Sequence, residues 1–280
     1  MARNEIISAE TGINGSEVGS HPDNKTIGMK LDIFNEKINI QINIEKDRAR
    51  LADIVPLALS ISTKINDLVI KNIQNNGQQI PCKKGCSACC KRCLVPLSVP
   101  EAFKLKDEVE RAPTNLQNSI NRNCIIASQH LLKQKSTKNF IGHLSDSNPE
   151  NQVRLNNISD WYTSLNLACP FLHQDICTIY EQRPLSCREH FIIGSAGGCQ
   201  NKDSSAKVVD MPVRMSNVLV QLASELEGTQ EQAVILPLAL LWCEDNRERA
   251  KKTWPFETMV RRFVEIIEEM ATKNLTAGAV

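Results

Sequence analysis

Nine of the eleven cysteines in this chain of 280 residues lie in two short segments. The first segment, residues 81–93, reads Pro-Cys-Lys-Lys-Gly-Cys-Ser-Ala-Cys-Cys-Lys-Arg-Cys, which is a C-x3-C-x2-C-C pattern followed by one further cysteine. The second segment, residues 169–199, holds four cysteines. Thiols at this density form disulfides, bind a soft metal ion or carry out redox chemistry.

The cellular compartment bears on the choice between disulfides and metal. The N-terminal residues lack the apolar stretch of a secretory signal, and no apolar run approaches the roughly 18 residues that a membrane-spanning helix needs. We therefore expect a cytoplasmic protein without a membrane partner, in which thiols stay reduced. Zinc takes four ligands, and an iron–sulfur cluster takes four thiolates. The predicted cofactor is Zn²⁺ or iron, with an Fe–S cluster among the alternatives.

Seven thiols are the predicted metal ligands. They are Cys82, Cys86, Cys89, Cys90, Cys169, Cys177 and Cys187. The adjacent Cys89 and Cys90 are not expected to ligate one ion together, because neighbouring side chains point apart in most backbone conformations. One of the two should then reach toward the second segment. This reasoning predicts that the two segments converge on one metal site.

The remaining cysteines and two histidines are less clearly assigned. The sequence leaves open whether four side chains also ligate: Cys93, Cys199, His173 and His190. Cys124 and Cys243 lie on apolar helical patterns, which predicts that both are core residues.

Several thiolates on one metal leave negative charge at the centre. Arg183 and Arg188 are expected to offset that charge and to donate hydrogen bonds to sulfur, and Tyr180 is expected to pack over the site. Glu181 and Glu189 are interpreted as solvated surface residues. No motif places a carboxylate or histidine as a base, so the catalytic residues are unknown and the sequence does not decide whether the protein is an enzyme.

The composition is that of an ordinary globular protein, with 41% hydrophobic and 23% charged residues. The net charge of +1 and the aromatic content of 4% argue against a nucleic-acid partner. The glycines at 194–198 do not form a phosphate-binding loop, because the stretch is short and lacks a strand–helix frame. A protein partner and the oligomeric state are not specified.

The fold that must position these residues is predicted to be mainly α-helical, with a short N-terminal β element and an irregular, metal-stitched, cysteine-rich centre. Residues 1–30 are polar and aperiodic, which predicts a disordered tail. Residues 31–275 are predicted to form a single domain, with 80–200 as its motif core. Strict alternation of isoleucine with polar residues predicts a strand over 38–44.

Helical periodicity accounts for most of the rest of the chain. Ser98 and Glu101 form a capping-box pattern, which predicts the start of a helix that runs to about Arg111. The other predicted helices cover 51–73, 115–132, a short stretch that ends near 167, 213–226, 231–250 and 256–272.

Four separated blocks resemble a known family. They are the C-x3-C-x2-C-C run at 82–90, Cys169-Pro170-Phe171-Leu172, the stretch from Cys177 to Pro184, and Cys187-Arg188. In this order the blocks are similar to the bacterial CxxCxxCC cysteine-cluster family, which is described as zinc- or iron-chelating. Most members have two residues between the first two cysteines, whereas this chain has three.

The resemblance covers about residues 80–200 and implies a metal-chelating domain. The leading prediction is a cytoplasmic metal-binding protein in which the metal has a structural or storage role. Flagellin lysine-N-methylases share the cysteine pattern, so a metal- or cluster-dependent enzyme is one alternative. A zinc-scaffolded adaptor is another.

Overall fold

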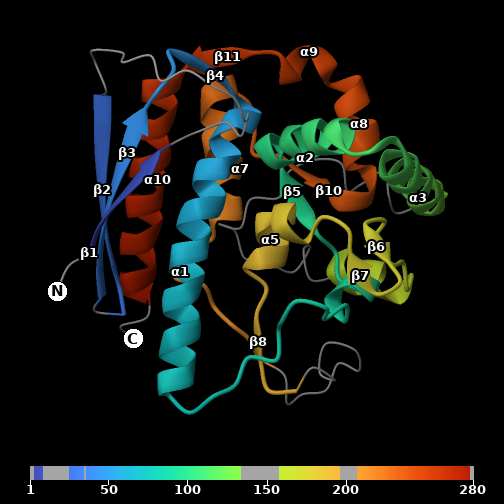
Figure 1. Cartoon of the computed structure of the whole chain (residues 1–280), viewed down its shortest axis with the longest axis horizontal. Helices are drawn as coiled ribbons and strands as arrows, with labels where there is room; N and C mark the ends of the chain where they lie inside the picture. The colour runs from blue at the N-terminus through green and yellow to red at the C-terminus, as the bar shows by residue number, and fades with distance from the viewer. Residues whose placement is uncertain (1–2, 9–24, 35, 134–157, 196–206, 278–280) are drawn as a thin grey trace.

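The computed structural model describes residues 3–8, 25–34, 36–133, 158–195 and 207–277. Helices make up most of this structure, and three strands near the N-terminus form the largest sheet (Figure 1). The predicted fold class is confirmed in these respects, and the cysteine-rich centre contains only short strands and helices.

The N-terminal sheet has the strand order β1–β3–β2. β2 (Lys25–Ile33) runs antiparallel to β3 (Glu36–Ile44), and β1 (Arg3–Ser8) pairs with β3 in parallel. Residues of β2 alternate between buried and exposed, as the period of two in a strand requires, and β2 contacts helix α10 (Phe256–Ala277). The strand predicted over 38–44 is confirmed as part of β3.

Strand β2 corrects the prediction of a disordered tail over residues 1–30. Ile27, Met29, Leu31 and Ile33 are buried and alternate with exposed residues. This alternation was overlooked because polar residues dominate the segment before it. Pairing with β3 and burial of one face stabilise the strand. The extent of the single domain, 31–275, stays a prediction.

Helix α2 begins as its sequence predicts, whereas the first four residues of the helix predicted over 51–73 form the 3-10 turn η1 (Leu51–Ile54) before α1. In α1 (Val55–Asn75), a proline occupies the first turn, where no backbone N–H is needed, and the helix ends just before Gly77, whose φ is 72°. In α2 (Val99–Arg111), Ser98 Oγ accepts a hydrogen bond from Glu101 N at 3.4 Å. Glu101 Oε2 accepts one from Ser98 N at 3.0 Å, which completes the predicted capping box. α3 (Thr114–Leu132) follows and is confirmed.

The predicted helix over 231–250 is wrong in its first part. Ala233–Ile235 form strand β10, which pairs antiparallel with β5 (Pro96–Ser98), and the 3-10 turn η5 (Leu236–Leu238) contains a proline. The β-branched Val234 and Ile235 favour the strand, and Pro237 cannot donate within a helix. Helix resumes as α8 (Ala239–Asp245) and α9 (Arg247–Ala250).

The last helices enclose the core. α7 (Met215–Glu227) packs against both α10 and α1, and the three stand alongside one another in Figure 1, with the N-terminal sheet beyond α10. β4 (Arg48–Arg50) pairs with β11 (Thr253–Pro255) just before α10. The predicted apolar face of α10 is confirmed, because Phe256, Met259 and Phe263 are fully buried.

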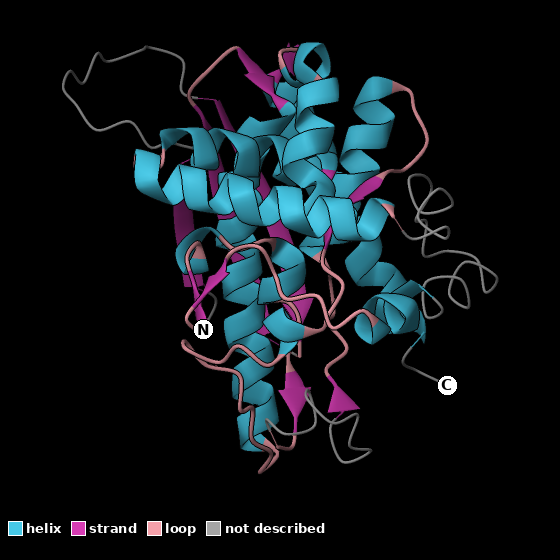
Figure 2. Ribbon diagram, turned by 90° about the vertical axis from the view of Figure 1, so that its right-hand side faces the viewer, coloured by secondary structure: helices cyan, strands magenta, loops and turns pink. Residues whose placement is uncertain are grey.

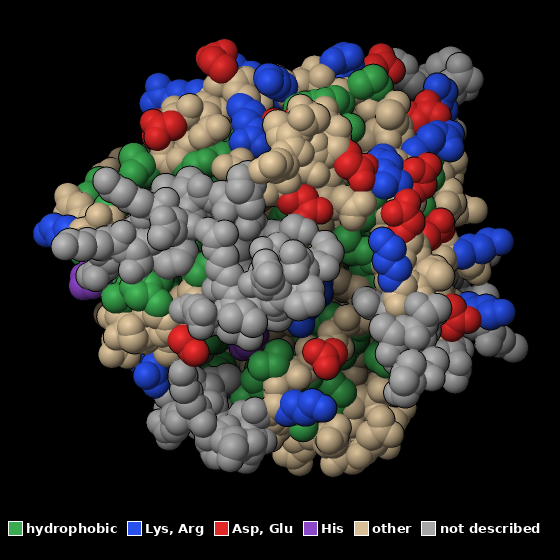
Figure 3. All heavy atoms as spheres, turned by 180° about the vertical axis from the view of Figure 1, so that it is seen from behind, with side chains coloured by type: hydrophobic (Ala, Val, Ile, Leu, Met, Phe, Trp, Pro, Cys, Tyr) green, Lys and Arg blue, Asp and Glu red, His purple; other side chains and the backbone are tan. Residues whose placement is uncertain are grey.

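The cysteine-rich segments lie at the loop-rich end of the molecule, below α2 in Figure 1 and toward the bottom of Figure 2. On the face shown in Figure 3, basic and acidic side chains are interspersed, in keeping with the net charge of +1. Of the helices that the structure describes, none combines the length and apolar character needed to cross a membrane.

Candidate metal centre

The first cysteine segment connects α1 to β5 as a series of tight turns. Gly85 has a φ of 91°, and Cys86 N donates to Lys83 O at 3.0 Å, which closes the turn between the first two cysteines. The 3-10 turn η2 (Cys89–Lys91) follows, with Cys93 N bonded to Cys89 O at 2.8 Å. All five thiols of this segment are half-buried.

The second cysteine segment is built from a hairpin and a one-turn helix. β6 (Leu172–His173) pairs with β7 (Ile176–Cys177), and the two residues between them have positive φ values of 47° and 61°. The 3-10 turn η4 (Tyr180–Gln182) leads to α5 (Leu185–Arg188), which carries Cys187. Cys187 N donates to Pro184 O at 3.0 Å, so the proline begins the turn that holds this thiol.

The two segments lie side by side. Cys169 N donates to Cys90 O at 2.7 Å, a direct backbone link between the two cysteine groups. Ion pairs at the surface join them again: Lys91 Nζ lies 2.7 Å from Asp175 Oδ1, and Lys84 Nζ lies 2.6 Å from Glu181 Oε1. The convergence expected from the sequence is therefore seen at the level of the backbone and of the surrounding charges.

The thiols of the two segments also act on one another. Burial raises the pKa of Cys187 well above the ordinary value, and the neighbouring Cys169, Cys89 and Cys177 raise it further. Burial likewise raises the pKa of Cys82, with smaller contributions from Cys86 and Cys89. Each of the seven predicted ligands is thus an electrostatic neighbour of at least one other. Below, "thiol basin" refers to these seven side chains.

Cys89 and Cys90 do not diverge as the sequence suggested. A hydrogen bond between the two side chains lowers the pKa of Cys89 to about 6 and raises that of Cys90. The tight turn of η2 accounts for this contact, because it keeps consecutive side chains closer than an extended backbone does. Cys90 still faces the second segment, where Cys169 and Cys187 act on it.

Arg183 is the basic residue most closely tied to the basin. Its guanidinium carbon lies 4.1 Å from the centre of the Tyr180 ring. Burial raises the pKa of Cys82, Cys177 and Cys187, and the positive charge of Arg183 partly opposes that rise. The same charge adds to the lowering of the pKa of Cys89 that its hydrogen bond with Cys90 causes. Tyr180 contacts Arg183 through a cation–π interaction, and its expected packing over the site stays a prediction.

Arg188 differs from its expected role. Its Nε donates to Arg183 O at 3.1 Å, and its Nη2 donates to Glu181 O, so both of these hydrogen bonds go to backbone carbonyls and not to sulfur. These bonds fix the chain on both sides of the Arg183 side chain.

Sequence reasoning missed the part played by Glu189. This residue was interpreted as solvated, yet only 1% of it is exposed. Its carboxylate accepts hydrogen bonds from Met215 N at 2.8 Å and Ser216 Oγ at 3.0 Å, at the start of α7, and from Ser62 Oγ at 3.3 Å on α1. Burial raises its pKa to about 7. Glu189 anchors the end of the second cysteine segment to two core helices, contacts that no local sequence pattern encodes.

Two buried cysteines outside the motif differ in their surroundings. Cys243 Sγ donates to Ala102 O at 3.3 Å in the core, as predicted. Cys124 is buried too. Burial raises its pKa to about 12, with a smaller contribution from the neighbouring Cys169. Cys124 therefore lies at the edge of the thiol basin. Cys199 falls outside the described residues.

The donor set fits a soft metal, although its atoms are not arranged around one. Within the described ranges, no three Cys, His, Asp or Glu side chains are placed to hold a metal ion. Chemically, several thiols converge, a guanidinium lies beside them to offset thiolate charge, and the buried Nε of Arg183 has no acceptor among the described residues. Every described cysteine is a free thiol. These features suit zinc or iron.

Comparison with known proteins assigns this part of the chain. Residues 81–208 match the family model CxxCxxCC, described as a putative zinc- or iron-chelating domain. The resemblance seen in the sequence is confirmed over this segment, which contains all seven predicted ligands. The comparisons with curated proteins and with solved structures found no match.

Proposed function

We propose that this protein binds zinc or iron through the thiolates of the basin. The observation that carries the proposal is the hydrogen bond from Cys169 N to Cys90 O, which holds the two cysteine segments together at a point where thiols from both are neighbours. The family match supports the same chemistry independently. An iron–sulfur cluster is a finer alternative within this proposal.

The proposed ligands come from the seven cysteines, and four thiolates are enough to complete a tetrahedral shell. When bound, the metal would cross-link two segments that contain little regular structure of their own. Because the basin supplies more thiols than one ion needs, we favour a structural or storage role over a catalytic one. Thiol ligands require a reducing compartment, so we infer a cytoplasmic location.

The test is anaerobic purification followed by elemental analysis and a visible spectrum. Bound zinc in a colourless protein, or iron with absorption near 400 nm from an Fe–S cluster, would support the proposal and choose between its forms. The double variant Cys86→Ser with Cys177→Ser, one change in each segment, should lose the metal. The matched control is Cys243→Ser, which changes a buried cysteine outside the basin. Wild-type protein without either metal after anaerobic purification would refute the proposal.

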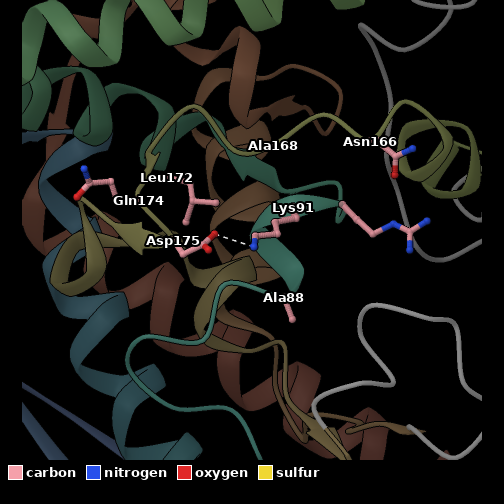
Figure 4. Close-up of a pocket in the computed structure, with 8 residues that line it drawn as sticks. Ala88, Lys91, Asn166, Ala168, Leu172, Gln174 and Asp175 are labelled. Atoms are coloured by element: carbon pink, nitrogen blue, oxygen red, sulfur yellow. Dashed lines mark ion pairs between the residues drawn. The ribbon is translucent and has the colours of Figure 1, made fainter.

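A cavity favours one second candidate, a metal- or cluster-dependent enzyme. An open cavity of about 780 Å³ lies along the seam between the cysteine segments. Ala88 and Lys91 line it from the first segment, Leu172 and Asp175 from the second, and Ala168 from just before the second (Figure 4). Such a space could admit a substrate beside the metal. X-ray absorption would separate the two roles: a light-atom ligand replaced on adding substrate means an enzyme, and an all-sulfur shell means a closed site.

A further inference from the structure

Two contacts restrain Arg183, one to its side chain and one to its backbone. Its guanidinium carbon lies 4.1 Å from the centre of the Tyr180 ring, which Lys84 Nζ also approaches, at 5.1 Å. The backbone carbonyl of Arg183 accepts a hydrogen bond from Arg188 Nε at 3.1 Å. An arginine fixed in this way loses little additional entropy when it donates a hydrogen bond.

The Nε–H of Arg183 is an unpaired donor within the part of the chain that the structure describes. Nε is buried, and no described residue accepts from it. An unpaired buried donor on a charged group is costly, and such donors in native proteins usually have a partner that the protein alone does not supply. The unpaired donor therefore indicates an acceptor that belongs to the occupied site.

The position of Arg183 in the chain identifies that acceptor. The residue lies between Cys177 and Cys187, on the turn that precedes α5, and its charge acts on Cys82 and Cys89 of the first segment as well. Arg183 thus borders thiols of both segments. Metal-bound thiolate sulfurs are negatively charged hydrogen-bond acceptors, and donors to them tune how basic the sulfur is.

We propose that Arg183 is a positioning residue that donates its Nε–H to a metal-bound cysteine sulfur and thereby makes the bound thiolates less nucleophilic. This inference rests on the proposed function. Beyond metal binding, it assigns to Arg183 the role of lowering the reactivity of the metal-bound thiolates. Without this donor, the bound sulfur would hold more electron density and would attack electrophiles faster.

The experiment compares zinc-loaded wild type with zinc-loaded Arg183→Met and Arg183→Lys. Each protein is treated with iodoacetamide, and alkylation of the cysteines is followed by mass spectrometry while zinc release is measured. We expect Arg183→Met to react about tenfold faster, the effect of losing one charge-assisted hydrogen bond. Arg183→Lys keeps the charge but not the fixed Nε–H and should lie between the two. It carries the test alone if Arg183→Met does not fold.

Arg249→Met is the matched control for a merely structural effect. Arg249 also lies over an aromatic ring, 5.4 Å from the centre of Trp242, and it pairs with Glu227 away from the cysteines. Its removal should destabilise the protein without changing the alkylation rate of the zinc-bound thiols. An alkylation rate that rises as much in Arg249→Met as in Arg183→Met would overturn the inference. A general loss of stability would then explain both increases.

A spectroscopic readout makes the inference independent of stability. With Co²⁺ in place of zinc, the sulfur-to-cobalt charge-transfer band should move to longer wavelength in Arg183→Met, because sulfur without the donor gives up electron density more readily. Unchanged band position and unchanged alkylation in fully loaded Arg183→Met would overturn the role of Arg183 but leave the proposed function intact. Wild type that holds no added zinc would defeat the proposed function itself, and the inference with it.

Discussion

Glu101 Oε1 accepts a hydrogen bond from the backbone N–H of Leu185 at 2.7 Å. The same carboxylate completes the capping box of α2 through Ser98, so one buried side chain begins two helices at once. Because α5 carries Cys187, this contact ties the second cysteine segment to the helical core at a point that does not depend on metal.

We predict that Glu101→Ala destabilises the protein strongly. The change leaves Ser98 N and Leu185 N without their acceptor, both in buried surroundings. The free energy of unfolding should fall by about 2–4 kcal/mol, measured by urea denaturation of the metal-free protein. Glu108→Ala on the same helix is the control. Glu108 pairs with Lys104 and Arg111 near the surface, so its loss should cost less than about 1 kcal/mol. Equal effects of the two changes would contradict this account.

Glu101 also predicts a pH dependence. Burial raises its pKa above the ordinary value of 4.5, and the hydrogen bonds from Leu185 and Ser98 only partly oppose this. The folded state therefore binds the proton more readily than the unfolded state. Its contribution to stability is fully present below pH 4.5 and is lost as the pH rises through the folded-state pKa. The stability of wild type relative to Glu101→Gln should fall as the pH rises above 4.5, measured by urea denaturation at several pH values. A constant difference would show that the pKa is not raised.

Breaking a largely buried ion pair should lower stability, whereas breaking an exposed one should leave it unchanged. Glu227 is paired with Arg249 through two hydrogen bonds at 2.6 and 2.8 Å, and its side chain is 3% exposed. Glu227→Gln should lower the free energy of unfolding by about 3 kcal/mol, because it leaves a largely buried charge without its counter-ion. Glu181→Gln removes an exposed partner of Lys84 and should leave the melting temperature unchanged. Similar melting temperatures for the two variants would contradict the prediction.

The local patterns of the sequence predicted the elements that depend on near neighbours. Ser98 and Glu101 are three residues apart, and their capping box begins α2 as expected. The isoleucines of β3 alternate with polar residues from Ile38 to Ile44, and the strand follows. Strand β10 was read as helix, because an apolar run such as Val234–Leu236 does not reveal its period, and its partner β5 lies far away in the chain.

The candidate site shows the same division. Cysteine spacing alone identified the two segments that meet at Cys90 and Cys169. Glu189 is held by hydrogen bonds from Ser62 on α1 and Met215 on α7. Both residues are distant from Glu189 in the sequence, so its neighbours in the chain do not predict that it is buried. The contact between Cys89 and Cys90 depends on one 3-10 turn, a detail of backbone angle that residue types do not encode.

The last prediction concerns coupling between metal and folding. The two cysteine segments differ in how they are tied to the core. Glu101 and Glu189 hold α5 of the second segment, and Phe171, Leu185 and Phe191 are buried. The first segment, residues 81–93, is a series of tight turns in which Ala88 alone is buried, and a backbone bond joins it to the second segment at Cys169 and Cys90. Metal binding should supply the missing stability, because its free energy adds to that of folding.

Removal of the metal with a chelator, or the double change Cys86→Ser with Cys177→Ser, should lower the melting temperature and speed amide hydrogen exchange first over 81–93 and 169–193. Exchange in α10, whose inner face is fully buried, should respond last. Cys243→Ser is the control for the loss of a thiol elsewhere in the protein. It should leave the metal bound and amide hydrogen exchange in the cysteine segments unchanged. A metal that contributes to folding must leave its own segments less stable when it is removed. Unchanged protection of both segments against hydrogen exchange after complete metal removal would therefore mean that packing alone orders them.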